Sequence, residues 1–135
     1  MVFEDNAVNI GLLALRIALG AVFIYHGFPK LKNPRAMATA FGNPNAVWFP
    51  AVLGFFETLS GVAVLLGLFT QLAAAVLALV MLGALYHKIV KWNIPFMAHD
   101  KTGWEFDLAL LAIALALFFL GAGQISLDAL LIWVS

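Results

Sequence analysis

Four long apolar runs constrain this chain more than any other feature of its sequence. The runs cover residues 10–28, 50–69, 72–90 and 104–120. Each is close to the about 20 residues that an α-helix needs to cross a bilayer. Charged residues make up only 10% of the chain, whereas an ordinary soluble domain contains roughly 25%. The sequence therefore predicts an integral membrane protein surrounded by a lipid bilayer.

An all-α fold is expected, because within lipid every backbone polar group must be hydrogen-bonded inside its own segment. Strands of a β-barrel would alternate polar and apolar residues, and residues 110–115 show no alternation. A soluble bundle would need polar outer faces, which the third and fourth runs lack. We therefore predict a single transmembrane domain over residues 1–135, folded as an antiparallel up-down-up-down four-helix bundle.

Prolines and glycines mark where the helices are expected to end. Pro29 and Pro34 should end the first helix, and Pro50 should lie in the first turn of the second. Residues 67–71 should form a tight turn before the third helix, and residues 93–95 should break the chain after it.

The charges predict an orientation. Four crossings place both termini on one side and the two longer linkers on the other. The linker side carries six basic residues, Lys30, Lys32, Arg35, Lys88, Lys91 and Lys101, whereas the terminal side carries only the acids Glu4, Asp5 and Asp128. The positive-inside rule then predicts a plasma-membrane protein with cytoplasmic linkers and both termini outside. Four tryptophans fall near helix ends, where aromatic belts lie: Trp48, Trp92, Trp104 and Trp133.

Composition also excludes several functions. The chain has no cysteine, so disulfides and thiol chemistry are excluded. Its net charge is zero, which gives no reason to expect nucleic acid as a partner. Histidine and glutamate could suit zinc or iron, but no closely spaced ligand motif is present, and we predict no metal site.

Two charged residues lie inside predicted helices, where each is a functional hypothesis by default. Arg16 should lean toward the terminal side, where it could reach lipid headgroups or the carbonyls at helix ends. Glu57 should lean toward the linkers and could be a hydrogen-bonding acid, a proton carrier or half of an ion pair. Because the two side chains lean apart, no direct pair between them is expected.

Small residues accompany both charges. Gly20 and Gly27 share a helix stripe with Arg16, and Gly54 and Gly61 share one with Glu57. Glycine lets helices approach closely in lipid, so these stripes should face each other and enclose both charges.

Further ionisable side chains gather where the helices meet the linkers: Tyr25, His26, Lys30, Tyr86, His87, Lys88, Lys91, Glu105 and Asp107. With Glu57 they could line a polar pocket entered from that side. The alternative is interface decoration, since acids at a helix start and bases at a helix end match the helix dipole. That alternative suits Lys88, Lys91, Glu105 and Asp107 better than the deeper His26 and Glu57.

Several short motifs in a fixed order carry a resemblance. They are Leu15-Arg16-Ile17-Ala18-Leu19-Gly20, His26-Gly27, Lys30-Leu31, Phe56-Glu57-Thr58-Leu59-Ser60-Gly61, Leu66-Gly67-Leu68-Phe69-Thr70, Gly103-Trp104-Glu105-Phe106 and Ser126-Leu127-Asp128. From Leu12 to Leu130 this order resembles the DoxX family of small four-helix membrane proteins of bacteria and archaea. By position, the family-motif residues are Arg16, His26, Lys30, Glu57 and Glu105, whereas His87 matches no motif.

The resemblance implies a link to membrane oxidoreductases. The family is similar to the small membrane subunit of an archaeal thiosulfate:quinone oxidoreductase, other members are linked to oxidative-stress resistance, and a distant eukaryotic relative is a cargo receptor. The chain has no flavin or dinucleotide motif, so quinone is the one cofactor expected. No residue is assigned a catalytic role.

Three hypotheses follow. The leading one is a membrane subunit or anchor of a quinone-linked oxidoreductase, with a quinone or small-ligand pocket near the cytoplasmic side. There His26 or Glu57 would hydrogen-bond the carbonyls and pass protons, and Lys30 or Arg16 would stabilise negative charge. The second is a non-catalytic binding or transport module for a small solute, lipid or partner protein. The third is a structural scaffold, and in each case a protein partner or homo-oligomer is expected.

Overall fold

The computed structural model describes the backbone of residues 2–134 and the side chains of residues 5–132. This part of the chain is helical, with no strand, and the predicted all-α class is confirmed. The elements are α1 (Val2–Lys32), α2 (Pro34–Ala40), α3 (Trp48–Leu66), α4 (Thr70–Tyr86), the π-helical turn η1 (His87–Lys91), α5 (Trp104–Leu120) and α6 (Leu127–Val134). The side chains of Glu4 and Trp133, used above for orientation and for the aromatic belt, lie outside the described residues.

Three helical segments are long and apolar enough to cross a membrane: residues Asp5–Lys32, Trp48–Leu66 and Thr70–Lys91. Helix α5 has the predicted bounds and is 17 residues long. The outward side chains are apolar; Leu79 is 69% exposed and Phe119 is 73% exposed. Such an extensive apolar surface suits lipid rather than water.

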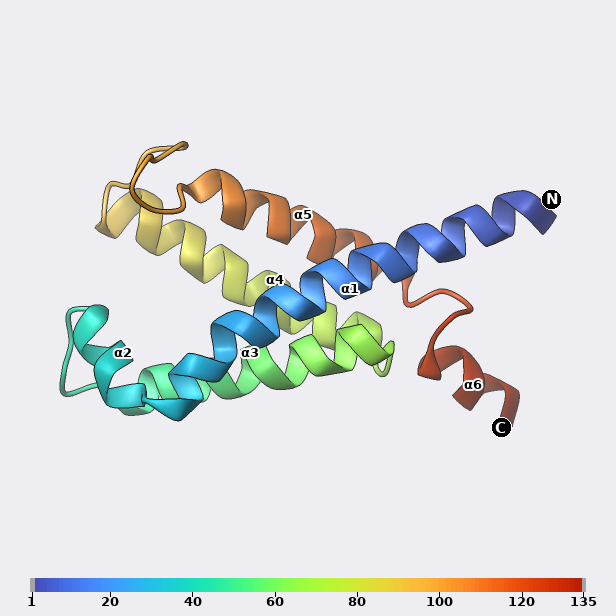
Figure 1. Cartoon of the computed structure of the whole chain (residues 1–135), viewed down its shortest axis with the longest axis horizontal. Coiled ribbons are helices and arrows are strands. Elements are labelled where there is room, and N and C mark those ends of the chain that lie inside the picture. Colours follow the sequence, from blue (N-terminus) through green and yellow to red (C-terminus); the bar gives the residue numbers. More distant parts are fainter. Residues whose placement is uncertain (1, 135) are drawn as a thin grey trace.

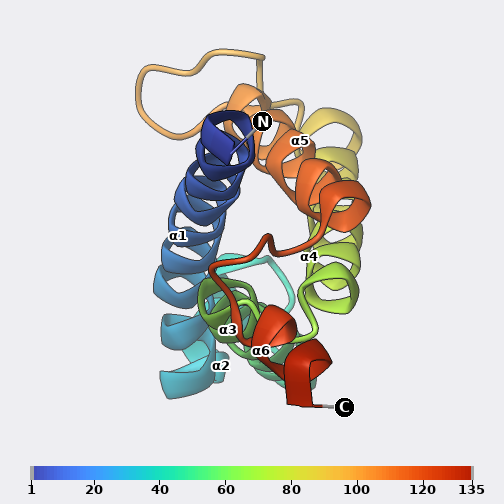
Figure 2. The same cartoon turned by 90° about the vertical axis from the view of Figure 1, so that its right-hand side faces the viewer.

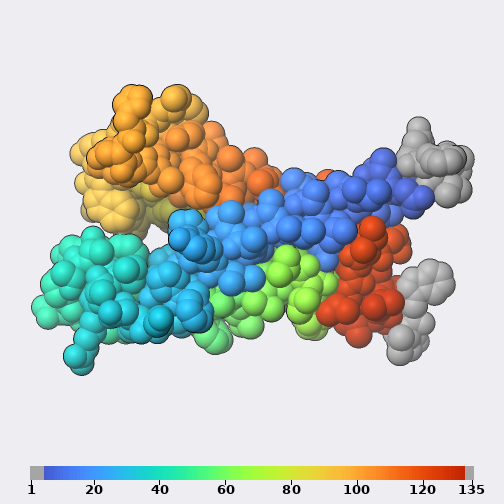
Figure 3. Space-filling model, viewed as in Figure 1, coloured from blue at the N-terminus to red at the C-terminus, as the bar shows by residue number. Residues whose placement is uncertain are grey.

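The long helices run in alternating directions (Figure 1), and α1 packs mainly on α3 while α4 packs mainly on α5. Helix α2 and the loop of residues 92–103 lie at one end of the molecule, here named the linker end. The start of α1, the α3–α4 turn and α6 lie at the other, the terminal end, which faces the viewer in Figure 2. In the space-filling view of Figure 3, the linker end lies at the left and the terminal end at the right.

The expectation that Pro29 ends the first helix is wrong. Helix α1 continues to Lys32, and the carbonyl of Pro29 accepts a hydrogen bond of 2.9 Å from the Asn33 N–H. Proline removes one N–H from the helix, and near the end of a span water can satisfy the carbonyl that loses its partner. The Asn33 side chain then starts α2 by accepting a 3.1 Å bond from the Ala36 N–H.

The glycine stripes of α1 and α3 face each other, as predicted. A Cβ atom at Gly20 would lie 2.7 Å from the Gly61 carbonyl oxygen, and one at Gly54 would lie 2.7 Å from the Lys30 Cβ. Only glycine permits backbones to approach this closely. The core that joins the helices contains fully buried Leu19, Phe23, Val64, Leu77 and Leu117.

At the terminal end, α6 is tied to the turn between α3 and α4. The turn, predicted from the sequence, uses left-handed backbone at Gly67 (φ 67°) and Phe69 (φ 47°). The Asp128 carboxylate accepts hydrogen bonds from the N–H groups of Phe69 (2.7 Å) and Thr70 (2.9 Å). Asp128 therefore caps the first turn of α4 from a distant part of the chain.

Candidate functional site

An ion pair joins α1 and α3 near the linker end. The Lys30 ammonium contacts the Glu57 carboxylate, and the two side chains are 13% and 4% exposed. Glu57 leans toward the linkers, as its position in the sequence predicts. Of the three roles considered for it, a hydrogen-bonding acid, a proton carrier or half of an ion pair, the structure shows the ion pair. The close approach at Gly27 and Gly54 brings the two side chains together.

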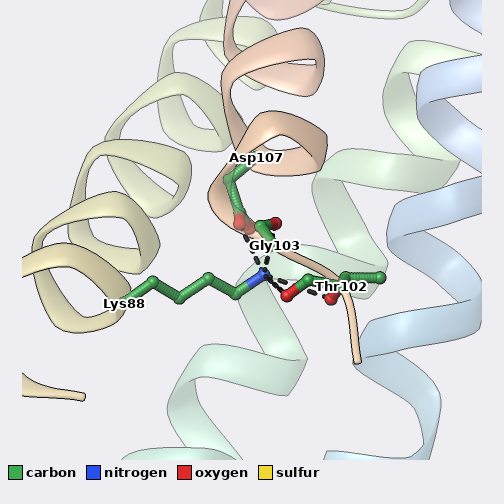
Figure 4. Close-up of polar contacts among 4 residues, drawn as sticks. All are labelled: Lys88, Thr102, Gly103 and Asp107. Atoms are coloured by element: carbon green, nitrogen blue, oxygen red, sulfur yellow. Dashed lines mark hydrogen bonds and ion pairs between the residues drawn. The ribbon is translucent and has the colours of Figure 1, made fainter. Parts of the chain in front are cut away.

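A second ion pair joins the end of α4 to the start of α5. The Lys88 Nζ lies 2.5 Å from the Asp107 Oδ2, and their side chains are 14% and 7% exposed. Lys88 also donates to the Thr102 carbonyl and hydroxyl and to the Gly103 carbonyl, at 3.2–3.3 Å (Figure 4). Asp107 is buried and Lys88 is mostly buried, and the ion pair between them is a feature that interface decoration does not predict.

The sequence contains a signal that Asp107 is buried and paired. Asp107 shares a buried stripe at helical spacing with Leu110, Leu111 and Ala114. An acid on the apolar, inward stripe of a helix requires a partner, whereas its place in the first turn alone suggests only a dipole interaction.

His26 lies close to both ion pairs. Its ring centroid is 6.1 Å from that of Phe106 on α5, and its side chain is exposed. The charged groups that act on the ring are Lys30, Asp107 and Lys88. His26, Lys30, Glu57, Lys88 and Asp107 are named here the linker-end cluster.

Glu105 and His87 lie outside this cluster of contacts. The Glu105 Oε2 atom is buried and has no hydrogen-bond partner among the described residues. His87 is exposed; its Nδ1 lies 2.8 Å from the Gly83 carbonyl, and its ring contacts Tyr86 and Trp92. Among the side chains of residues 5–132, no group of three His, Asp or Glu residues is arranged to hold a metal ion.

Arg16 lies near the terminal end, 2% exposed, and makes no pair with Glu57. Lipid headgroups and helix-end carbonyls are the two partners that the sequence allows for Arg16, and the structure shows it bonded to the carbonyls. Its Nε and Nη2 donate 3.0 Å bonds to the Val64 and Leu65 carbonyls at the end of α3. Its Nη1 donates to the carbonyls of Ala122 (3.1 Å) and Ile125 (2.5 Å), so that one guanidinium joins three segments.

The surface has an apolar hollow of about 270 Å³ beside the end of α1, lined by Leu31, Phe55, Thr58, Leu59 and Val62. A second hollow, of about 570 Å³, lies at the terminal end and is lined by Asp5, Val8, Asn9 and Gln124. Neither hollow is lined by a member of the linker-end cluster.

Comparison with known proteins agrees with the resemblance. The DoxX family model matches residues 11–100. A Bacillus subtilis protein named "Putative oxidoreductase CatD" is 32% identical over 125 residues, which cover 92% of this chain and 89% of that protein. A Haemophilus influenzae uncharacterized protein is 36% identical over 124 residues, covering 87% of each chain. A Mycobacterium tuberculosis uncharacterized membrane protein is 30% identical over 131 residues, covering 87% of this chain and 78% of that one. No solved structure matches the chain.

Proposed function

This chain belongs to the DoxX family of membrane proteins, and we propose that it is the membrane-embedded subunit or anchor of a quinone-linked oxidoreductase. In this proposal α5 is the fourth crossing of the bundle, and the linkers face the cytoplasm from the plasma membrane. The name of the Bacillus subtilis relative supports a link to oxidoreductases. The absence of a flavin or dinucleotide motif in the sequence favours a subunit that works with a redox partner.

The observation that carries the proposal is the position of His26, an exposed imidazole close to both ion pairs. A quinone headgroup needs a hydrogen-bond donor at its carbonyl and a source of protons as it is reduced. His26 can supply both, and the Lys30 ammonium nearby would stabilise negative charge on the headgroup oxygen. The residues therefore fit a quinone headgroup, whose electrons would come from the partner subunit.

Glu57 has a supporting role in this proposal. Its carboxylate holds the Lys30 ammonium, four residues after His26 in α1. Residues four apart share one helix face, so the ion pair would hold the Lys30 side chain in place beside the His26 ring. Arg16, whose hydrogen bonds lie at the terminal end, takes no part in the proposed site.

Binding of a short-chain menaquinone analogue to the purified protein tests the proposal. Quenching of tryptophan fluorescence would report binding, with His26→Ala as the test variant and His99→Ala, an exposed histidine of the 92–103 loop, as the matched control. We expect His26→Ala to weaken binding about tenfold, the effect of losing one good hydrogen bond. Equal binding by wild type and His26→Ala would remove His26 from the site, and no binding by wild type would reject the quinone proposal.

One observation favours the alternative of a non-catalytic binding or transport module. Arg16, Lys30, Glu57 and Lys88 all have their polar groups occupied by partners inside the protein. Such occupancy suits helix positioning rather than chemistry. Mass spectrometry of small molecules and lipids that copurify with the protein separates the two readings: a retained solute or lipid, together with no quinone binding, would favour the module.

A further inference from the structure

The basic residues at the linker end divide into a paired, mostly buried set and an exposed set without ion pairs. Of the six basic residues there, Lys30 and Lys88 are mostly buried and form ion pairs with Glu57 and Asp107. The other four are exposed and form no ion pair within the described residues: Lys32, Arg35, Lys91 and Lys101. Asp100 is the exposed acid at this end. With Glu57 and Asp107 paired and Glu105 partly buried, the four exposed basic residues outnumber the exposed acid, and they leave a positive surface that the zero net charge of the chain conceals.

Exposed aromatic side chains lie beside these basic residues. Trp48 is 67% exposed and Trp92 is 47% exposed, and Trp92 directly follows Lys91. The Lys91 Nζ also lies 6.0 Å from the centroid of the half-exposed Tyr86 ring. Tryptophan and tyrosine concentrate at the headgroup level of a membrane, so these neighbours favour a position of Lys91 near the lipid phosphates.

We propose that the linker end binds anionic phospholipid headgroups through Lys32, Arg35, Lys91 and Lys101. The four residues come from the end of α1, from α2, from η1 and from the 92–103 loop, elements that lie at the linker end (Figure 1). Basic residues spread over four separate elements suit a layer of phosphates better than one compact protein partner. The inference does not depend on quinone binding or on a redox partner.

Thermal unfolding in mixed micelles tests this inference. The purified full chain would be compared with added phosphatidylglycerol, with added phosphatidylcholine, and with inorganic phosphate alone. We expect phosphatidylglycerol to raise the unfolding midpoint more than phosphatidylcholine, and the difference to shrink at high salt. Each Lys→Gln or Arg→Gln change at the four positions should weaken phosphatidylglycerol binding about fivefold.

The variants should fold, because all four side chains are exposed and make no ion pair. Asp5→Asn, at the exposed start of α1 on the terminal end, changes the net charge without touching the site and should leave the lipid preference unchanged. The inference is wrong if the two lipids stabilise the wild type equally, in which case an acidic protein is the better partner. It is also wrong if the fourfold variant keeps the preference, or if inorganic phosphate alone reproduces the stabilisation.

Discussion

Lys30 on α1 and Glu57 on α3 neutralise each other inside the helical bundle, where the Glu57 side chain is only 4% exposed. A buried ion pair gains little over a well-packed apolar pair, but a buried charge that has lost its partner is strongly destabilising. The stability of the fold therefore depends on having both members of the pair or neither.

Glu57→Leu should lower the free energy of unfolding by about 3–5 kcal/mol, because the Lys30 ammonium stays buried without its carboxylate. The double variant Lys30→Met/Glu57→Leu should recover most of that loss. Unfolding in detergent, followed by circular dichroism, measures both. A double variant that is as unstable as the single one would contradict this account of the pair.

Lys88→Met should disturb both Asp107 and the loop. The Asp107 carboxylate would be buried without a cation, and Thr102 and Gly103 would lose a shared donor. We expect a loss of about 3–5 kcal/mol and faster amide hydrogen exchange at residues 101–103. Lys91→Met, at an exposed lysine three residues later, should change stability by no more than about 0.5 kcal/mol. If Lys88→Met and Lys91→Met changed stability by similar amounts, the ion pair of Lys88 would not be the cause of the loss.

Arg16→Lys should destabilise the terminal end although it keeps the charge. An ammonium lacks the planar fork of a guanidinium, so it cannot serve the four carbonyls at residues 64, 65, 122 and 125 together. We expect a loss of about 2–4 kcal/mol and faster proteolysis within residues 121–126. Arg35→Lys, at an exposed position, is the control and should behave as wild type.

Gly20→Ala and Gly83→Ala should have opposite effects although both lie in helices. A Cβ at Gly20 would meet the Gly61 carbonyl at 2.7 Å and force α1 away from α3, whereas a Cβ at Gly83 meets nothing within 4 Å. The first should cost about 1–3 kcal/mol through overpacking. The second should stabilise by up to about 1 kcal/mol, since alanine favours helix. Thermal unfolding of the two variants measures both effects, and midpoints that shift in the same direction would contradict the prediction.

The sequence predicts the long helices well because hydrophobicity is a local property. The bounds of α5 were predicted without error, and the α3–α4 turn follows from Gly67. The facing glycine stripes were also predictable, since helical spacing alone sets which residues share a side. Pro29 is a misleading signal for the end of the helix, because near the end of a span water can satisfy the one carbonyl that loses its partner, and α1 continues to Lys32.

The candidate site was only partly predictable. The direction in which Glu57 leans follows from helix geometry, but its choice of Lys30 depends on how closely α1 approaches α3. The second ion pair was missed because Lys88 and Asp107 each satisfy a simpler rule about helix ends. Helices α2 and α6 were missed as well, since both are too short to show a spanning pattern.

The carbonyl bonds of Arg16 have a consequence for biosynthesis. The Ile125 carbonyl that receives its shortest bond is 109 residues further along the chain. While the ribosome is still making the later helices, this cation has only part of its final coordination. Two of its four carbonyl partners, at residues 122 and 125, exist only once nearly the whole chain has been made, so Arg16 can complete its hydrogen bonds only at the end of synthesis.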